Sequence, residues 1–404
     1  MRASMRAAAS LALILALLFA GCGGSDKTET GASASEVASG SDYVDWPLFG
    51  RVPQRTHYLK AEGKALDPPL KQAWSVNTHA LIEFPPAIHD GVAYVINKYG
   101  NGKAVRLSDR KVLWELNVRP SDKGKPNFVT APVYYDGRVY GAFLTGNLAA
   151  GDAETGKKDW VRKLHAHLES SPLAVDGKLY LGTDTTNLLA LDAAGGKTLW
   201  SFNAPGAIKA SPSYDDGKVF FADYQSSMFA LDAESGKLVW RSNTSKVPPF
   251  GRGGFFSSPA VAFGRVYAAR DDGTVYGFDE KTGKVEWSFD TGAAVYGSPA
   301  VAQVPGTPPT VYIGAENGRF FALDPRSGKE RWHHDVGGPI PGTATVIGHT
   351  VYTSSFKTQE TTGFDVRTHK PTFRMKQAGY TPMVSDGERL YLIGYYDLIG
   401  LEAR

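Results

Sequence analysis

Residues 228–240 read MFALDAESGKLVW, and close variants of this stretch recur along the chain. The copies are LAAGDAETGKKDW, LLALDAAGGKTLW, VYGFDEKTGKVEW, FFALDPRSGKERW and the more divergent TTGFDVRTHKPTF. Each copy places an aspartate two positions after an alanine or glycine, continues into a turn, and ends on an aromatic residue eight positions after the aspartate. Recurrence of one unit at a regular interval is the signature of a repeat architecture.

The aspartates and the closing aromatic residues define the period. The aspartates are Asp152, Asp192, Asp232, Asp279, Asp324 and Asp365. The aromatics are Trp160, Trp200, Trp240, Trp287, Trp332 and Phe373, and Trp114 and Trp74 extend the series toward the N-terminus. Intervals of 40 to 47 residues are typical of four-stranded propeller blades. We expect the indole rings to wedge between neighbouring blades, and the aspartates to accept hydrogen bonds from turn N–H groups.

The two ends of the chain each supply part of a blade. Residues 389–404 read as inner strands with no closing tryptophan, whereas residues 68–77 read as an outer strand with nothing before it. Joining them closes the ring and hides both sheet edges. The sequence therefore predicts an all-β fold over residues 43–404. We expect a monomeric, eight-bladed β-propeller of four-stranded blades, closed by one composite blade from the N- and C-terminal segments.

The N-terminal residues read as a targeting segment. Arg2 and Arg6 precede an apolar run that is too short to span a membrane, so residues 1–21 are predicted to be a signal peptide. Cys22 is the only cysteine, and it falls where cleavage would occur. Residues 19–22 resemble a bacterial lipobox, which implies lipidation at Cys22. Residues 22–42 are small and polar, as in a flexible tether. We expect an exported protein, lipid-anchored to the cell envelope.

The repeat, written A-x-D-x-x-T-G-x-x-x-W, resembles that of quinoprotein propellers, and the resemblance covers residues 74–404. Three groups share this repeat: dehydrogenases that use pyrrolo-quinoline quinone (PQQ), BamB-type lipoproteins of outer-membrane barrel assembly, and uncharacterised bacterial propellers that include sensors. The lipobox, the tether, the blade number and the length are most similar to the second and third groups. The resemblance implies a protein-binding scaffold, with a PQQ-dependent dehydrogenase and a ligand-sensing propeller as the alternatives.

Composition and motifs narrow the functions further. Lys and Arg (44) nearly balance Asp and Glu (41), which gives no reason to expect a nucleic-acid partner. The chain has no H-E-x-x-H, C-x-x-C, G-x-S-x-G or Walker motif and no compact calcium loop. It also lacks the adjacent cysteines of quinone-dependent alcohol dehydrogenases. We expect no catalytic residue, no metal site and no cofactor, with PQQ and calcium implied only under the dehydrogenase alternative.

Propellers bind at the end of the central channel, through loops that lead into the innermost strands. The repeat register places Glu169 and Lys209 there on successive blades, where they could pair, and Tyr296 two blades further along. Residue Ile340 is expected at the same position in a later blade.

The longest of these loops, residues 247–256, places Arg252, Phe255 and Phe256 near the axis. An arginine beside exposed aromatic rings is a candidate anchor for a partner. The alternative is that the two phenylalanines plug the channel and the arginine is solvated. Arg270 and Asp223 are secondary candidates in loops on the same side.

Overall fold

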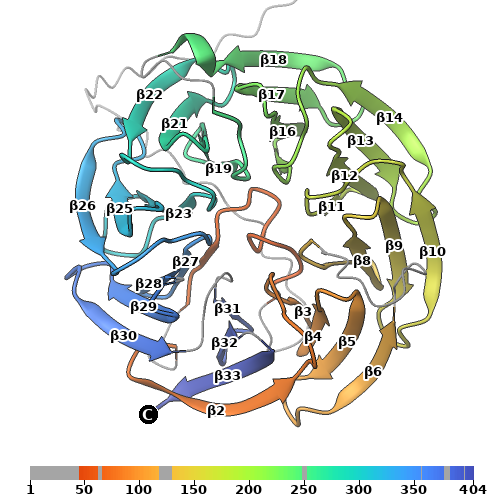
Figure 1. Cartoon of the computed structure of the whole chain (residues 1–404), viewed down its shortest axis with the longest axis vertical. Helices are drawn as coiled ribbons and strands as arrows, with labels where there is room; N and C mark the ends of the chain where they lie inside the picture. Colours follow the sequence, from red (N-terminus) through yellow and green to blue (C-terminus); the bar gives the residue numbers. More distant parts are fainter. Residues whose placement is uncertain are drawn as a thin grey trace, which may run out of the picture. The chain divides into compact units, whose positions relative to one another are not determined.

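In a computed structural model, the chain is described at residues 45–61, 66–117, 130–247, 253–355, 357–376, 383–394 and 396–404. These residues form eight β-sheets arranged in a ring (Figure 1), which confirms the predicted eight-bladed propeller. The predicted signal peptide, Cys22 and the tether lie outside the described residues. Within the described part of the chain, no helix has the length and apolar character needed to cross a membrane.

Each blade contains four antiparallel strands, ordered from the channel outward. Blade 1 has β3 (Ala87–His89), β4 (Val92–Ile96), β5 (Asn101–Arg106) and β6 (Val112–Asn117). Blade 2 has β7 (Val133–Tyr135), β8 (Arg138–Ala142), β9 (Asn147–Asp152) and β10 (Lys158–Lys163). Blade 3 has β11 (Leu173–Val175), β12 (Lys178–Gly182), β13 (Asn187–Asp192) and β14 (Thr198–Asn203). Blade 4 has β15 (Ser213–Asp215), β16 (Lys218–Ala222), β17 (Ser227–Asp232) and β18 (Leu238–Asn243), followed by the short 3-10 helix η1 (Thr244–Lys246).

The second half of the ring follows the same order. Blade 5 has β19 (Ala260–Ala262), β20 (Arg265–Ala269), β21 (Thr274–Asp279) and β22 (Val285–Asp290). Blade 6 has β23 (Ala300–Ala302), β24 (Thr310–Gly314), β25 (Arg319–Leu323) and β26 (Glu330–Asp335). Blade 7 has β27 (Thr345–Ile347), β28 (Thr350–Ser355), β29 (Glu360–Asp365) and β30 (Pro371–Lys376), and the short β1 (Tyr58–Leu59) adds to its inner edge.

Blade 8 is the predicted composite. It has β31 (Val384–Ser385), β32 (Leu390–Ile393) and β33 (Asp397–Ala403) from the C-terminal end, and β2 (Leu70–Asn77) from the N-terminal end. β2 pairs antiparallel with β33, with Trp74 opposite Gly400. Ring closure thus depends on backbone hydrogen bonds between segments more than 300 residues apart. These bonds pair the edge of β33 that would otherwise be free.

The repeat tryptophans wedge between blades, as expected. The Trp200 ring lies over the turn of the next blade, so that a Cβ added to Gly236 would meet it at 2.6 Å. Its Nε1 donates to the backbone oxygen of Ala233 in the same turn at 3.1 Å. The repeat aspartates bind that turn from within: Asp232 Oδ1 accepts from the N–H of Ser235 at 2.8 Å. In blades 2 to 6 the turn glycine lies against the indole of the blade before it in the same way.

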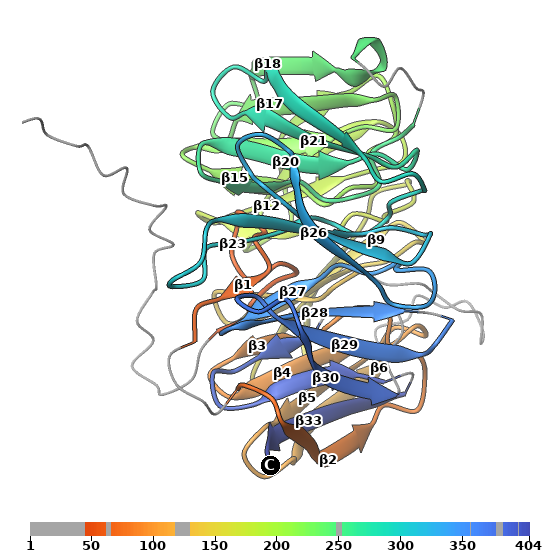
Figure 2. The same ribbon diagram turned by 90° about the vertical axis from the view of Figure 1, so that its left-hand side faces the viewer.

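One element was not expected from the repeats. Residues 46–59, which we call the axial segment, cross the centre of the ring instead of adding to a blade's outer edge (Figure 1). The segment forms backbone hydrogen bonds with the innermost strands. Trp46 and Ile88 bond to each other through both their N–H and C=O groups. Further along, the N–H groups of Tyr134, Tyr214, Val261, Val301 and Val346 donate, respectively, to the backbone oxygens of Pro47, Pro53, Gln54, Thr56 and His57. These bonds reach blades 1, 2, 4, 5, 6 and 7. Figure 2 shows the segment leading into β1 beside β23 and β27.

Candidate functional site

The mouth of the central channel holds a cavity of about 600 Å³, which we call the mouth pocket. Its wall is built by the loops that lead into the innermost strands, the place where the sequence predicted a site. The pocket is lined by Phe49, Glu83, Phe84, Thr130, Leu144, Leu168, Glu169, Ser171, Lys209, Ser211, Tyr224, Phe256, Ser258, Tyr296, Gly297, Ser298, Pro341, Gly342 and Thr343. A volume of this size is in the range of ligand sites.

The axial segment contributes Phe49 to the pocket and is fixed there by Arg55. The guanidinium of Arg55 is fully buried and donates to the backbone oxygens of Pro212 (2.6 Å), Phe49 (2.5 Å), Ser171 (3.2 Å) and Pro172 (3.2 Å). These bonds join the segment to blades 3 and 4. Burial lowers the pKa of Arg55 to about 9. Because carbonyl dipoles surround the guanidinium, its charge is satisfied without a carboxylate.

His57 lies buried in the same segment. Its ring packs edge-on against Phe49, with centroids 4.7 Å apart. Neither ring nitrogen has a hydrogen-bond partner among the described residues. Burial, followed by the nearby charge of Arg55, lowers the pKa of His57 to about 3. The imidazole is therefore neutral at physiological pH, because a buried imidazolium would gain nothing to offset its desolvation.

A belt of hydroxyl groups encircles the mouth pocket and links consecutive blades. The hydroxyls of Ser171, Ser211, Ser258, Ser298 and Thr343 each accept a hydrogen bond from the N–H of the matching residue one blade earlier, at 2.8 to 3.1 Å. These hydroxyl groups were not among the residues predicted from the sequence. The recurring Ser-Pro pairs at 171–172, 211–212, 258–259 and 298–299 were the available signal.

Glu169 and Lys209 meet in the pocket wall, as their register predicted. The Lys209 ammonium lies 3.0 Å from the Glu169 carboxylate and 4.9 Å from the centroid of the Tyr224 ring. Both charged side chains are about 70% buried, with exposed fractions of 28% and 29%. Burial raises the pKa of the Tyr224 hydroxyl to about 12. The pair therefore presents little net charge to a ligand while retaining hydrogen-bonding capacity.

Two aromatic side chains stand at the pocket rim. Phe256 and Tyr296 pack edge to face, with ring centroids 5.9 Å apart. They remain 36% and 41% exposed, so they are two of the eight exposed large apolar side chains in the described part of the chain. Large rings that are held in place and still accessible are the usual anchors of a protein interface. The sequence prediction placed both residues correctly at the channel mouth.

Phe255, Arg270 and Asp223 do not line the mouth pocket. Phe255 is fully buried and packs beside Tyr276, with centroids 6.1 Å apart. Its pairing with the backbone of Arg270 turns it away from its neighbour Phe256. The prediction that both phenylalanines are exposed near the axis was therefore wrong for Phe255. Arg252 lies outside the described residues.

Arg270, Asp223 and Ile340 are also buried. The Arg270 guanidinium pairs with the Asp272 carboxylate and donates to the backbone oxygen of Thr244 at 3.3 Å. Asp223 accepts hydrogen bonds from three backbone N–H groups, and burial raises the pKa of its carboxyl. Both side chains shape loops and do not face a ligand. The expected position of Ile340 was one residue off, because Pro341 lines the pocket.

Part of this chain is similar in sequence to curated dehydrogenase subunits. It is 38% identical over 140 residues to the dehydrogenase subunit of a quinone alcohol dehydrogenase from Gluconacetobacter polyoxogenes, a match that covers 32% of this chain and 19% of that protein. The corresponding subunit from Gluconobacter oxydans is 36% identical over 146 residues, covering 33% and 19%. The matched region thus spans about a fifth of the length of these curated relatives.

Solved structures share the fold at low identity. BamB from Moraxella catarrhalis superposes with a TM-score of 0.68 at 17% identity, covering 83% of this chain and 98% of that one. The quinohemoprotein alcohol dehydrogenase from Comamonas testosteroni has a TM-score of 0.74 at 15% identity, covering 89% and 80%. Because identity is so low in both cases, these likenesses establish the propeller architecture and nothing finer.

The mouth pocket offers few ligands for the metal of a quinone cofactor. The described part of the chain has no group of three or more His, Cys, Asp or Glu side chains that could hold a metal ion. Two glutamates line the pocket, Glu83 and Glu169, and Lys209 already neutralises the second. Phe49 and the axial segment behind it also occupy the centre of the ring.

The family comparison covers most of the chain. A family model described as outer membrane protein assembly factor BamB matches residues 65–201, 145–251 and 186–397. The overlapping matches follow the repeat through the whole ring and run from just before β2 to β33. This chain therefore belongs to the propeller family described as outer membrane protein assembly factor BamB.

Proposed function

We propose that this chain is a non-catalytic scaffold of the cell envelope that holds a protein partner at its mouth pocket. Membership of the BamB family supports a role in protein assembly. The observation that carries the proposal is the exposed Phe256–Tyr296 pair at the rim of a preformed pocket. Burying these two rings against a partner would remove apolar surface from water, which is favourable.

The pocket behind the rings supplies polar contacts for the same partner. The Glu169–Lys209 pair lies in the wall, and the hydroxyl belt lies deeper. Each belt hydroxyl accepts one backbone N–H and keeps its own hydrogen available for donation. A partner loop that inserts an apolar or aromatic side chain would bury the rings and present its carbonyl oxygens to these donors.

The experiment compares capture of barrel-assembly components by two forms of the chain in its host. Phe256→Ala combined with Tyr296→Ala should reduce recovery by about tenfold or more, since hot-spot aromatics each contribute about 2 kcal/mol or more. Leu238→Ala, at an exposed side chain on the outer strand β18, is the matched control and should capture normally. Equal recovery by the double variant and the control would remove the rim from the proposal.

A quinone-dependent dehydrogenase is the second candidate, because the curated relatives carry that activity in their names. Purified protein incubated with PQQ and calcium should neither retain the quinone nor reduce a dye when an alcohol is added. Retention of quinone together with dye reduction would replace the scaffold proposal.

Attachment to a membrane through lipidated Cys22 is part of the same proposal. It rests on the lone cysteine and the apolar run before it. Cys22→Ser should move the chain from the membrane fraction to the soluble fraction. An unchanged distribution would argue against the anchor while leaving the partner site untouched.

A further inference from the structure

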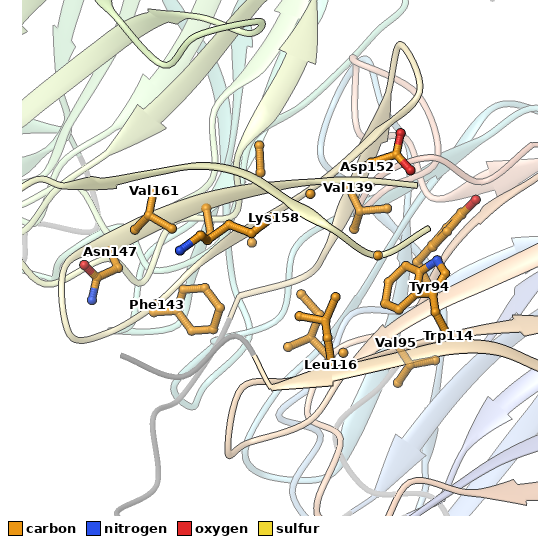
Figure 3. Close-up of a pocket in the computed structure, with 17 residues that line it drawn as sticks. Tyr94, Val95, Trp114, Leu116, Val139, Phe143, Asn147, Asp152, Lys158 and Val161 are labelled. Atoms are coloured by element: carbon orange, nitrogen blue, oxygen red, sulfur yellow. The ribbon is translucent and has the colours of Figure 1, made fainter. Parts of the chain in front are cut away.

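A second cavity lies away from the channel, between blades 1 and 2. It has a volume of about 510 Å³, and we call it the interblade slot (Figure 3). Its walls come from strands β4, β5 and β6 on one side and from β8, β9 and β10 on the other. The side chains around it are mostly apolar, including Ile96, Leu116, Phe143 and Val161. None of the residues that line the slot also lines the mouth pocket.

The slot exists because blade 2 carries unusually small residues at one cross-strand pair. Gly141 on β8 lies opposite Ala149 on β9. The same paired position holds Leu181 and Leu189 in blade 3, Phe221 and Phe229 in blade 4, and Ile313 and Phe321 in blade 6. The side chains of Ile96 and Phe143 reach over Gly141 in blade 2, and the slot lies beside them.

The facing side of the interface is also smaller here. In blade 3, Phe202 packs against Phe221 and Phe229 of the next blade, with centroids 5.9 Å and 5.8 Å apart. At the position of Phe202, blade 1 has Leu116. The contact made elsewhere by three aromatic rings is therefore made here by one leucine, one alanine and one glycine. An apolar space of this size, lined by a packed scaffold, favours an apolar ligand over water.

The slot has one cationic end. Lys158 on β10 lines it, and in Figure 3 the lysine ammonium points toward the end where Asn147 and Phe143 lie. Among the described residues, the Lys158 ammonium has no ion pair or hydrogen bond. The opposite end is closed by Tyr94, Trp114 and Val139 (Figure 3). The lining also includes Asp152, whose carboxylate accepts hydrogen bonds from Thr155 in its own turn. The cavity thus joins apolar walls to one ammonium group without a partner in the described part of the chain.

We propose that the interblade slot binds a long-chain fatty acid. The acyl chain lies along Leu116, Ile96 and Val139, in the space left by Gly141 and Ala149, and the carboxylate meets the Lys158 ammonium. A single chain matches a narrow gap between two sheets, and one carboxylate matches one unpaired lysine. This site is independent of the proposed scaffold function, because it shares no residue with the mouth pocket.

The test measures binding of dodecanoate and of dodecanol to the purified, delipidated full chain by calorimetry. We expect one dodecanoate site per chain. Gly141→Leu combined with Ala149→Leu copies the pair of blade 3 and fills the slot, so it should weaken both ligands at least about tenfold. Gly141 has no left-handed φ, and an added Cβ would meet the end of the Ile96 side chain at 2.9 Å and the Phe143 ring at 3.5 Å, so that Ile96 must shift slightly. The double variant should therefore remain folded, as checked by thermal unfolding.

The Lys158→Gln variant removes the positive charge and leaves the apolar walls of the slot unchanged. This exposed residue keeps most of its stem as glutamine, so folding should not change. Dodecanoate should bind about fivefold or more weakly, while dodecanol should bind as before, because the alcohol does not use the positive charge. Lys163→Gln on the same strand is the control and should leave both ligands unaffected. Absence of dodecanoate binding, or equal binding by the Leu–Leu variant, would overturn the proposal.

Discussion

Replacing His57 by asparagine should make the propeller less sensitive to acid. His57 has a left-handed φ of 53° in the axial segment, and asparagine tolerates that conformation better than most residues. Asparagine does not titrate in this range. Any packing lost against the Phe49 ring applies at every pH, so it changes the level of the stability curve and not its slope.

The magnitude follows from the pKa of the buried imidazole. In the fold the pKa of His57 is about 3, whereas its ordinary value is 6.5. At pH values between these two pKa values, His57 is protonated in the unfolded chain and neutral in the folded chain. The free energy of unfolding therefore decreases as the pH falls. The full difference corresponds to about 5 kcal/mol, at about 1.36 kcal/mol per pKa unit. About 3 kcal/mol of this should be lost between pH 7.5 and pH 4.

The assay is urea unfolding at pH 7.5 and pH 4, followed by tryptophan fluorescence. Carboxylates also titrate over this range, but their contribution is common to both proteins and cancels in the difference. The original chain should lose about 3 kcal/mol more than His57→Asn between the two pH values. His165→Asn is the control, because this exposed histidine has a matching φ of 52°. Equal losses in the original chain and His57→Asn would refute the reasoning.

Two further predictions concern contacts between blades. Gly236→Ala should destabilise the fold by about 1 to 3 kcal/mol more than Gly217→Ala, because both glycines have φ near 70° but only at Gly236 would a Cβ strike the Trp200 ring. Equal denaturation midpoints for the two variants would contradict this. Ser211→Ala should cost about 1 to 2 kcal/mol by leaving a buried N–H of the neighbouring blade unpaired. Ser213→Ala, whose hydroxyl has no partner among the described residues, should be nearly neutral in the same urea titration.

The blades themselves were encoded locally. Each aspartate, its turn and the tryptophan that follows lie within a dozen residues, as at Asp232 and Trp240. The turn even survives where its glycine is lost: Arg110 and His369 replace that glycine and adopt the same left-handed φ, at 64° and 61°. Strand alternation and turn chemistry therefore predict the blade, and the count of repeats predicts the ring.

The mouth pocket was only partly predictable. Repeat register located Glu169, Lys209, Phe256 and Tyr296, because equivalent positions in a ring converge on one end. It did not separate Phe256 from Phe255, although the two are adjacent. In an extended strand, the side chains of adjacent residues point to opposite sides. Which of the two sides faces solvent depends on the blade that packs against the strand.

The sequence by itself determined the all-β blades, their number and the seam where the two ends meet. Only the tertiary structure placed the axial segment, because three of the four hydrogen-bond acceptors of Arg55 lie more than 100 residues away and no periodic pattern marks the segment. The interblade slot has the same origin. Nothing in the sequence around Gly141 and Ala149 marks a cavity, because the slot is formed only where blade 2 packs against blade 1. Local chemistry fixes each sheet, whereas cavities are properties of two surfaces brought together.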